Sequence, residues 1–274
     1  SGNDFEDINI YTFNSFGYEI IKENSFQFSL GKDIKVLSSA ESWQLIYKLF
    51  REHEFEHINL KKSPGKVVQD IISYIDSLKN NLITAQNLEH YIQHHYQYLQ
   101  NYSSSALFRE EKEAVKVQRE LASIYRLYEE MKKESNSIDY QDQVYLPYFL
   151  LTEKDDIRES YRNRYSYIFV DEFQDTNIAQ AYFLALLKSP TNKMVVVGDD
   201  DQGIYSFRGA CVENILNFDH WEQFRQHRVK DFYLTTNFRS GSNIISALNQ
   251  VISANQNRFE KFLSRTQTFG VPVI

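Results

Sequence analysis

The feature that most constrains the fold and function of this chain is an apolar segment that ends on two adjacent carboxylates. Tyr167-Ile-Phe-Val170 runs directly into Asp171 and Glu172. Apolar runs of this length are typical of a strand buried on both faces of a parallel sheet. Because ligands collect at the carboxyl ends of such strands, Asp171 is placed to bind a divalent cation and Glu172 to act on water. An Asp-Glu pair alone is more often a solvated start of a loop, so this interpretation depends on the rest of the chain.

A second apolar segment ends in the same way. Lys193-Met-Val-Val-Val-Gly198 precedes three successive carboxylates, Asp199 to Asp201. Three like charges in a row repel one another and are costly without a cation or a basic partner. Gln202 follows them, and its amide can both donate and accept hydrogen bonds, so it suits a phosphate or a water. The pattern predicts a second strand with a polar, ligand-facing end.

Aromatic residues follow the strand-like segments. Tyr205 and Phe207 offer flat faces, with Arg208 beside them. A third strand-like run, Asp231–Thr236, leads into Asn237-Phe238-Arg239. Both segments thus place an aromatic side chain next to an arginine.

Five segments together resemble a superfamily 1 DNA helicase of the UvrD/Rep/PcrA kind, and their order and spacing fit over nearly the whole chain. Asp171-Glu-Phe-Gln-Asp-Thr176 resembles the Walker B motif of that family. The other segments are Tyr11–Phe16, Ser137–Asp142, Gly198–Ala210 and Leu234–Ser240. The resemblance implies the fold class: a partial RecA-like P-loop NTPase sheet, α/β and parallel, with an inserted all-helical subdomain.

The resemblance also implies the cofactors, ATP and Mg²⁺, and a role for each residue near them. Asp171 would lie next to the metal, and Glu172 would be the general base. Gln174 and Gln202 would sense the γ-phosphate.

Two further residues are implied by the segment that follows the third strand-like run. Phe238 stands where the family usually has a tyrosine stacked on adenine. Arg239 stands where the family has an arginine finger.

The implied partners are single-stranded DNA and junctions between single and double strands, with repair or recombination proteins as further candidates. The implied DNA-binding residues come from two segments: Thr12, Phe13, Asn14, Tyr205, Phe207 and Arg208. Three residues depart from the family pattern. Phe207 replaces tryptophan and keeps a stacking face, Gly203 replaces serine, and Asn14 replaces histidine, which leaves its DNA role open.

A phosphate-binding loop of the form Gly-x-x-x-x-Gly-Lys-Ser/Thr is not found in the sequence. Lysine follows only Gly31 and Gly65, and the residues five positions before these glycines are Phe26 and Leu60. We therefore expect the chain to begin after this loop and to end before a second motor domain. The chain alone is expected to be inactive.

The residue pattern predicts three regions: the start of the motor core over residues 1–37, a helical subdomain over 38–136, and the rest of the core over 137–274. A strand is expected over 8–13, with a helix following to about residue 23.

Four helices are expected in the middle region. Ser38 and Glu41 form a capping box, Thr84 suits a helix start, and apolar residues recur at helical spacing over 68–78 and 114–131. Another helix is expected over 243–252.

Composition limits the alternatives. A net charge of −7 argues against a general nucleic-acid coat, although a motor can hold one strand by stacking. A single cysteine, Cys211, suits a reducing cytoplasm, where it is expected to be a small packing residue. No apolar run approaches the length of a membrane span. His90 and His94 are interpreted as a polar helix face rather than a metal site.

Two other functions remain open. A metal-dependent nuclease would use Asp171, Glu172 and the carboxylates of residues 199–201, because two-metal sites need clustered carboxylates. A non-catalytic DNA-binding or regulatory module would need none of this chemistry.

Overall fold

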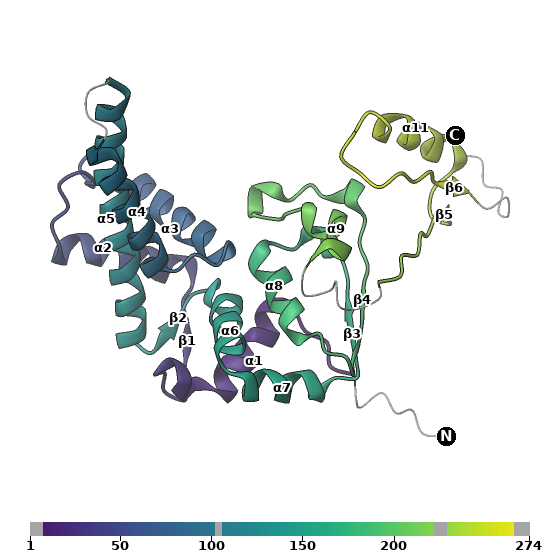
Figure 1. Cartoon of the computed structure of the whole chain (residues 1–274), viewed down its shortest axis with the longest axis horizontal. Helices are drawn as coiled ribbons and strands as arrows, with labels where there is room; N and C mark the ends of the chain where they lie inside the picture. The colour runs from purple at the N-terminus through teal and green to yellow at the C-terminus, as the bar shows by residue number, and fades with distance from the viewer. Residues whose placement is uncertain (1–7, 102–105, 222–228, 266–274) are drawn as a thin grey trace. The chain divides into compact units, whose positions relative to one another are not determined.

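The computed structural model describes residues 8–101, 106–221 and 229–265 (Figure 1). The chain divides into two compact units. The first comprises Ser1–Ser160 and Ile178–Leu186, and the second comprises Tyr161–Asn177 and Leu187–Ile274.

Four helices dominate the first unit: α2 (Ser39–Glu52), α3 (Pro64–Asn80), α4 (Ala85–Asn101) and α5 (Ala106–Glu134). The expected starts are confirmed. The Ser38 hydroxyl and the Glu41 side chain form a reciprocal capping box, and the Thr84 hydroxyl accepts a 3.0 Å hydrogen bond from the amide of Asn87. Such caps satisfy amides that have no partner within the helix.

The helices bury the apolar stripe that their sequence periodicity predicts. Ile46, Leu49, Val68, Ile124 and Tyr125 have no exposed area. Each such aliphatic side chain contributes about 1.5–3 kcal/mol when it leaves water. α4 and α5 lie side by side, as Figure 1 shows.

Helix α1 (Phe13–Glu23) packs against α6 (Asp142–Glu153) in the same unit. A Cβ at Gly17 would lie 1.7 Å from the carbonyl oxygen of Gln143, so only glycine permits this approach. The strand expected over 8–13 is wrong, because residues 8–12 form no strand and Thr12 caps α1 instead.

Two short strands join the ends of the helical part. β1 (Lys35–Val36) pairs in parallel with β2 (Ser137–Ile138). The chain therefore leaves and re-enters at adjacent strands, which suits an inserted subdomain. The region boundaries at 37 and 136 remain a prediction. The other elements of this unit are η1 (Ser25–Phe28), most of α7 (Asp155–Arg164) and α8 (Ile178–Leu187).

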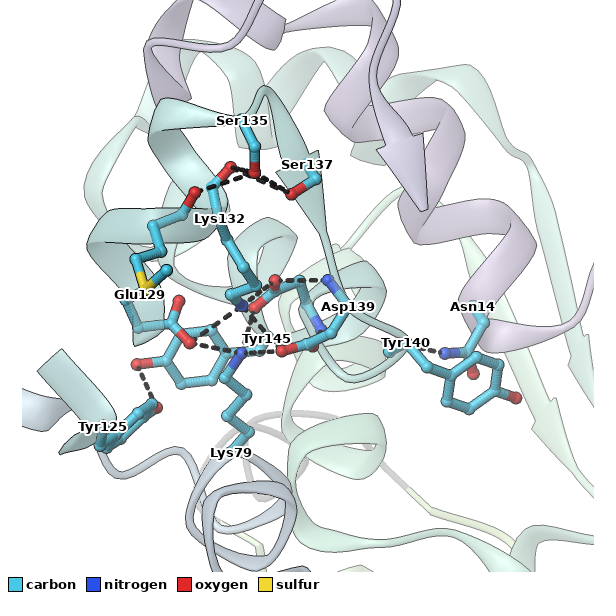
Figure 2. A network of polar contacts seen from close by, with 12 residues as sticks. Asn14, Lys79, Tyr125, Glu129, Lys132, Ser135, Ser137, Asp139, Tyr140 and Tyr145 are labelled. Atoms are coloured by element: carbon cyan, nitrogen blue, oxygen red, sulfur yellow. Dashed lines mark hydrogen bonds and ion pairs between the residues drawn. The ribbon is translucent and has the colours of Figure 1, made fainter. Parts of the chain in front are cut away.

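A buried ion-pair network fixes the helices to the segment after β2 (Figure 2). The Lys79 ammonium on α3 lies 2.6 Å from carboxylate oxygens of both Asp139 and Asp142. Lys132 on α5 contacts the same two carboxylates. Glu129 lies 2.7 Å from Lys79 and 2.9 Å from Lys132. Burial alone would lower the pKa of Lys79, but these carboxylates raise it well above its usual value.

The second unit contains β3 (Tyr167–Val170), which pairs in parallel with β4 (Lys193–Val196). Both strands were predicted, but burial on both faces is wrong for β3. Tyr167 is 57% exposed and Phe169 is 73% exposed. These side chains share one face of the two-stranded sheet, and that face is largely exposed.

The remaining elements of this unit are short: η2 (Phe173–Asp175), η3 (Asp200–Gln202), η4 (Ser206–Arg208), α9 (Glu213–Leu216), η5 (Phe218–His220), β5 (Thr236–Asn237), α11 (Ser242–Ile252) and β6 (Ser264–Arg265). The predicted strand over 231–236 is wrong except at its end, where β5 pairs with β6. The predicted helix over 243–252 is confirmed as α11.

The architecture is α/β, rich in helix and with short parallel strand pairs. Within the described ranges, no helix is both long and apolar enough to cross a bilayer.

Candidate functional site

The two carboxylates after β3 lie exposed at its carboxyl end, as predicted. Asp171 Oδ1 accepts a 3.0 Å hydrogen bond from the amide of Glu172. Glu172 has a left-handed backbone, with φ of 49°. This conformation is uncommon for residues other than glycine and costs about 1–3 kcal/mol, and it often occurs at functional sites.

Gln174 connects this strand end to the next one. Its side chain is buried, and its Nε2 donates a 2.7 Å hydrogen bond to Glu172 Oε2. Its Oε1 accepts a 3.0 Å hydrogen bond from the amide of Asp199. One side chain therefore fixes Glu172 relative to the loop that follows β4.

The three carboxylates of that loop have basic partners, a requirement anticipated from the sequence. Arg258 donates to both oxygens of Asp201, at 2.8 and 2.6 Å. Lys261 lies 2.5 Å from Asp199 Oδ1 and also contacts Asp200. Arg258 and Lys261 were not predicted from the sequence. The need of the acidic run for cations was the available signal, but it does not identify which basic residues supply them.

Electrostatics around Asp199 follow from these contacts. Burial raises the pKa of this carboxyl, but hydrogen bonds from Lys261 and Gln202 outweigh it, so the pKa is lowered. Gln202 Nε2 lies 2.7 Å from Asp199 Oδ2. The Asp199 carboxylate therefore stays ionised and orients the predicted phosphate sensor Gln202.

The two acidic groups differ in their fit to Mg²⁺. Asp171 is exposed and offers carboxylate oxygens of the kind that Mg²⁺ prefers. Oxygens of Asp199 to Asp201 lie close enough together for a metal, but Arg258 and Lys261 already occupy that place. The structure therefore favours Asp171 as the candidate metal ligand.

Tyr205 and Phe207 lie together after the acidic loop. Their ring centroids are 6.0 Å apart with an interplanar angle of 51°. Phe207 is 75% exposed, so it is not a core residue. The loop is not extended there, because residues 206–208 form the turn η4. The side chain of Arg208 lies outside the described part of the structure.

Phe238 and Arg239 directly follow β5, and both are exposed. Asn237 Oδ1 accepts hydrogen bonds from the amides of Arg239 and Ser240, at 2.9 and 2.8 Å. This turn sets the direction in which the chain leaves the strand.

Thr12, Phe13 and Asn14 lie in the first unit, at the start of α1. Thr12 caps the helix, and Phe13 is half-buried. Asn14 is buried and donates a 2.8 Å hydrogen bond to the carbonyl oxygen of Tyr140 (Figure 2). Its amide therefore holds the exposed Tyr140 segment, and its DNA role remains a prediction.

The remaining candidate residues are Cys211, His90 and His94. Cys211 is half-buried, and burial raises the pKa of its thiol. His90 and His94 lie on α4, and no acidic or cysteine partner joins them in a metal-binding group among the described residues.

Comparison with known proteins identifies the class. The family model described as the UvrD/REP helicase N-terminal domain matches residues 1–223. This chain belongs to the UvrD/Rep helicase family.

Several curated relatives align over nearly the whole chain. DNA helicase II of Haemophilus influenzae is 29% identical over 96% of this chain and 32% of its own length. ATP-dependent DNA helicase Rep of Salmonella typhimurium is 30% identical, covering 95% of this chain and 34% of its own. A putative ATP-dependent DNA helicase of Bacillus subtilis, YjcD, is 38% identical over 57% of this chain and 20% of its own length. Nearly all of this chain aligns with helicase II and Rep, but it spans only about a third of the length of these relatives.

Proposed function

We propose that this chain is part of an ATP-dependent DNA helicase that couples ATP hydrolysis to movement on single-stranded DNA and to unwinding at junctions. β3 and β4 would belong to a RecA-like parallel sheet of the longer protein, called the full-length protein below. The full-length protein would act in the cytoplasm, with repair or recombination proteins as partners.

One set of contacts carries the proposal. Gln174 links Glu172 to the backbone of Asp199, and Asp199 holds Gln202, through contacts of 2.7, 3.0 and 2.7 Å. Glu172 and two amide side chains are thereby held at the ends of two adjacent parallel strands. Phosphoryl transfer depends mostly on such positioning and on charge stabilisation.

Each residue then has a role in hydrolysis. Glu172 would take the proton of the attacking water, and Asp171 would hold Mg²⁺, which supplies charge neutralisation of the phosphates. Gln174 and Gln202 would orient the water and the γ-phosphate. Phe238 would stack on the adenine, and Arg239 would neutralise transition-state charge.

The DNA-binding role rests on two neighbouring rings, the exposed Phe207 and the half-buried Tyr205. Tyr205 and Phe207 present tilted rings in one loop, and bases stack on such rings without sequence preference. This loop begins at Gln202, so DNA contact and nucleotide contact would share one segment. Thr12 and Phe13 would contribute from α1.

The nuclease alternative is less favoured. A two-metal site needs carboxylate oxygens that are open to cations, whereas Asp199, Asp200 and Asp201 contact Lys261 and Arg258. The amide network around Gln174 would also have no task in a nuclease. A regulatory module without catalysis stays a possible outcome of the test.

The test is ATP hydrolysis by the full-length protein with single-stranded DNA. Glu172→Gln keeps the shape of the side chain but removes the base, so turnover should fall by about 10²–10⁴ while nucleotide and DNA binding persist. Arg239→Ala should lower turnover by about 10³–10⁵. Retention of more than a tenth of wild-type turnover by either variant would remove that residue from the mechanism.

The chain alone serves as the matching negative control. Its sequence has no phosphate-binding loop, so DNA-stimulated turnover should stay below about one per second, the lower end for enzymes. Turnover by the chain alone would contradict the proposed dependence on a longer protein.

A further inference from the structure

The segment Arg258–Lys261 contacts all three carboxylates of the acidic loop. Besides the paired contacts of Arg258 and Lys261, the amide of Phe259 donates a 2.8 Å hydrogen bond to Asp200 Oδ2. Lys261 also lies 3.3 Å from Asp201 Oδ2. Each aspartate is therefore held by at least one donor from this segment.

These contacts are shielded from water except at Asp199, whose side chain is 33% exposed. The side chains of Arg258, Asp201 and Lys261 are 12%, 13% and 14% exposed. The side chain of Asp200 is 2% exposed. Shielded, two-pronged contacts between arginine and carboxylate are among the strongest and most directional in proteins. The contacts are therefore unlike surface ion pairs, which contribute little.

The same segment is anchored at its other end to the strand that precedes Phe238. Asn249 on α11 is buried, donates a 2.8 Å hydrogen bond to the carbonyl of Leu263 and accepts one of 3.1 Å from its amide. The next residues form β6, which pairs with β5. A continuous connection runs from the acidic loop through residues 258–265 to the turn that bears Phe238 and Arg239.

We propose that Arg258 and Lys261 are positioning residues for ATP hydrolysis. They clamp the Asp199–Asp201 loop, and Asp199 in turn holds Gln202 through its carboxylate and Glu172 through Gln174. This inference rests on the proposed function. The clamp fixes the strand-end groups relative to Phe238 and Arg239, because one segment binds both.

The clamp also has an electrostatic consequence. Three uncompensated carboxylates would repel the phosphates of a nucleotide bound at the same strand ends. Arg258 and Lys261 cancel most of that charge without touching the predicted water-activating residue Glu172. The acidic loop then orients Gln202 rather than binding a cation.

The experiment compares Lys261→Met and Lys261→Arg in the full-length protein, with Lys230→Met as the control, because Lys230 is exposed in the same unit. Misplacement of reacting groups by about 1 Å costs up to about 10²-fold in rate. Lys261→Met should lower kcat about 10–100-fold, raise the KM for ATP by a smaller factor because carboxylate charge is left uncompensated, and leave DNA affinity unchanged. Lys261→Arg should restore most of kcat, and Lys230→Met should match the wild type.

Thermal melting of each variant separates positioning from simple loss of fold, with kinetics measured well below the melting temperature. If folded Lys261→Met keeps wild-type kcat, the clamp is not a positioning device. A lower kcat in Lys261→Met that Lys261→Arg fails to restore, although both are folded, would also contradict it.

Hydrogen exchange keeps the two proposals distinguishable. The amide of Asp199 donates to Gln174, and the amide of Gln202 donates to the carbonyl of Asp199. In Lys261→Met these amides should exchange at least tenfold faster than in Lys230→Met. If the wild-type protein hydrolyses no ATP, the proposed function fails. Unchanged exchange overturns the clamp whether or not ATP is hydrolysed.

Discussion

Gly198 lies so close to Gln174 that a Cβ built on the glycine would be 2.6 Å from Gln174 Oε1. The same Cβ would lie 2.8 Å from the terminal methyl of Ile215. Real Cβ atoms do not approach other atoms this closely, so the absence of a side chain at residue 198 lets Gln174 reach Glu172 and Asp199 at once.

Gly198→Ala should therefore displace Gln174 and destabilise the second unit. Overpacking of this kind typically costs about 1–3 kcal/mol, which denaturant unfolding of the chain would measure. In the full-length protein, ATP turnover should fall as well, because Glu172 loses its hydrogen-bond donor.

Gly65→Ala is the matched control for this change. A Cβ at Gly65 meets no atom within 4 Å, and the residue lies in the first turn of α3. Alanine there should be neutral or stabilising by up to about 1 kcal/mol. Equal stability of the two variants would show that Gly198 is not needed for the approach of Gln174.

Local signals made part of this structure predictable. Ser38 and Glu41 fixed the start of α2 through a cap that needs only neighbouring residues. The apolar segments before Asp171 and before Asp199 were both predicted as strands, but their parallel pairing was not. Caps and periodicity act within a few residues, so a sequence reveals them.

The structural features that the sequence did not predict depend on contacts between residues far apart in the chain. The run over 231–236 has strand-like residues, yet Phe232 and Leu234 are exposed and no described strand pairs with them. The two-residue strands β1 and β2 pair across about 100 positions, which no local pattern encodes. Lys79 and Lys132 were missed because lysine is almost always a surface residue unless it is paired.

The buried network makes Lys132 a sensitive position. Lys132→Met removes one of the two cations that Asp139 and Asp142 share. Breaking a buried pair by removing one partner typically costs about 3–5 kcal/mol, because a charge is left uncompensated. Denaturant unfolding of the chain should show a loss of this size.

Lys133→Met is the control, because the neighbouring lysine on α5 is exposed. Its effect should stay within about 0.5 kcal/mol, as for most surface substitutions. A loss below about 1 kcal/mol for Lys132→Met would mean that the network contributes little to stability.

Asp76 on α3 should make the chain less stable as the pH rises. Burial and, to a smaller extent, the nearby Asp139 carboxylate together raise the pKa of this carboxyl to about 6, although the Lys79 and Lys132 ammonium groups oppose the rise. The folded state therefore binds this proton more tightly than the unfolded state. The contribution of Asp76 to stability is complete below about pH 4 and is lost as the pH rises through about 6.

Asp76→Asn removes this loss, so the variant should be more stable than the wild type at pH 7 by about 3 kcal/mol, from a rise of the pKa from 3.8 to about 6 at about 1.4 kcal/mol per pKa unit. The difference should shrink as the pH falls from 6 to 4. Asp70→Asn, an exposed carboxyl on the same helix, should show no such trend. A pH-independent difference for Asp76→Asn would contradict the raised pKa.

Phe207 distinguishes a DNA-stacking role from a packing role. Because its side chain is 75% exposed, Phe207→Ala should change the free energy of unfolding by no more than about 0.5 kcal/mol. Under the stacking proposal, the same change in the full-length protein should weaken single-strand binding by about 1–3 kcal/mol. Phe26→Ala, which truncates a ring that is 73% exposed in the first unit, should leave DNA affinity unchanged. Fluorescence anisotropy and thermal melting on the same samples measure both quantities, and unchanged affinity in folded Phe207→Ala would exclude the stacking role.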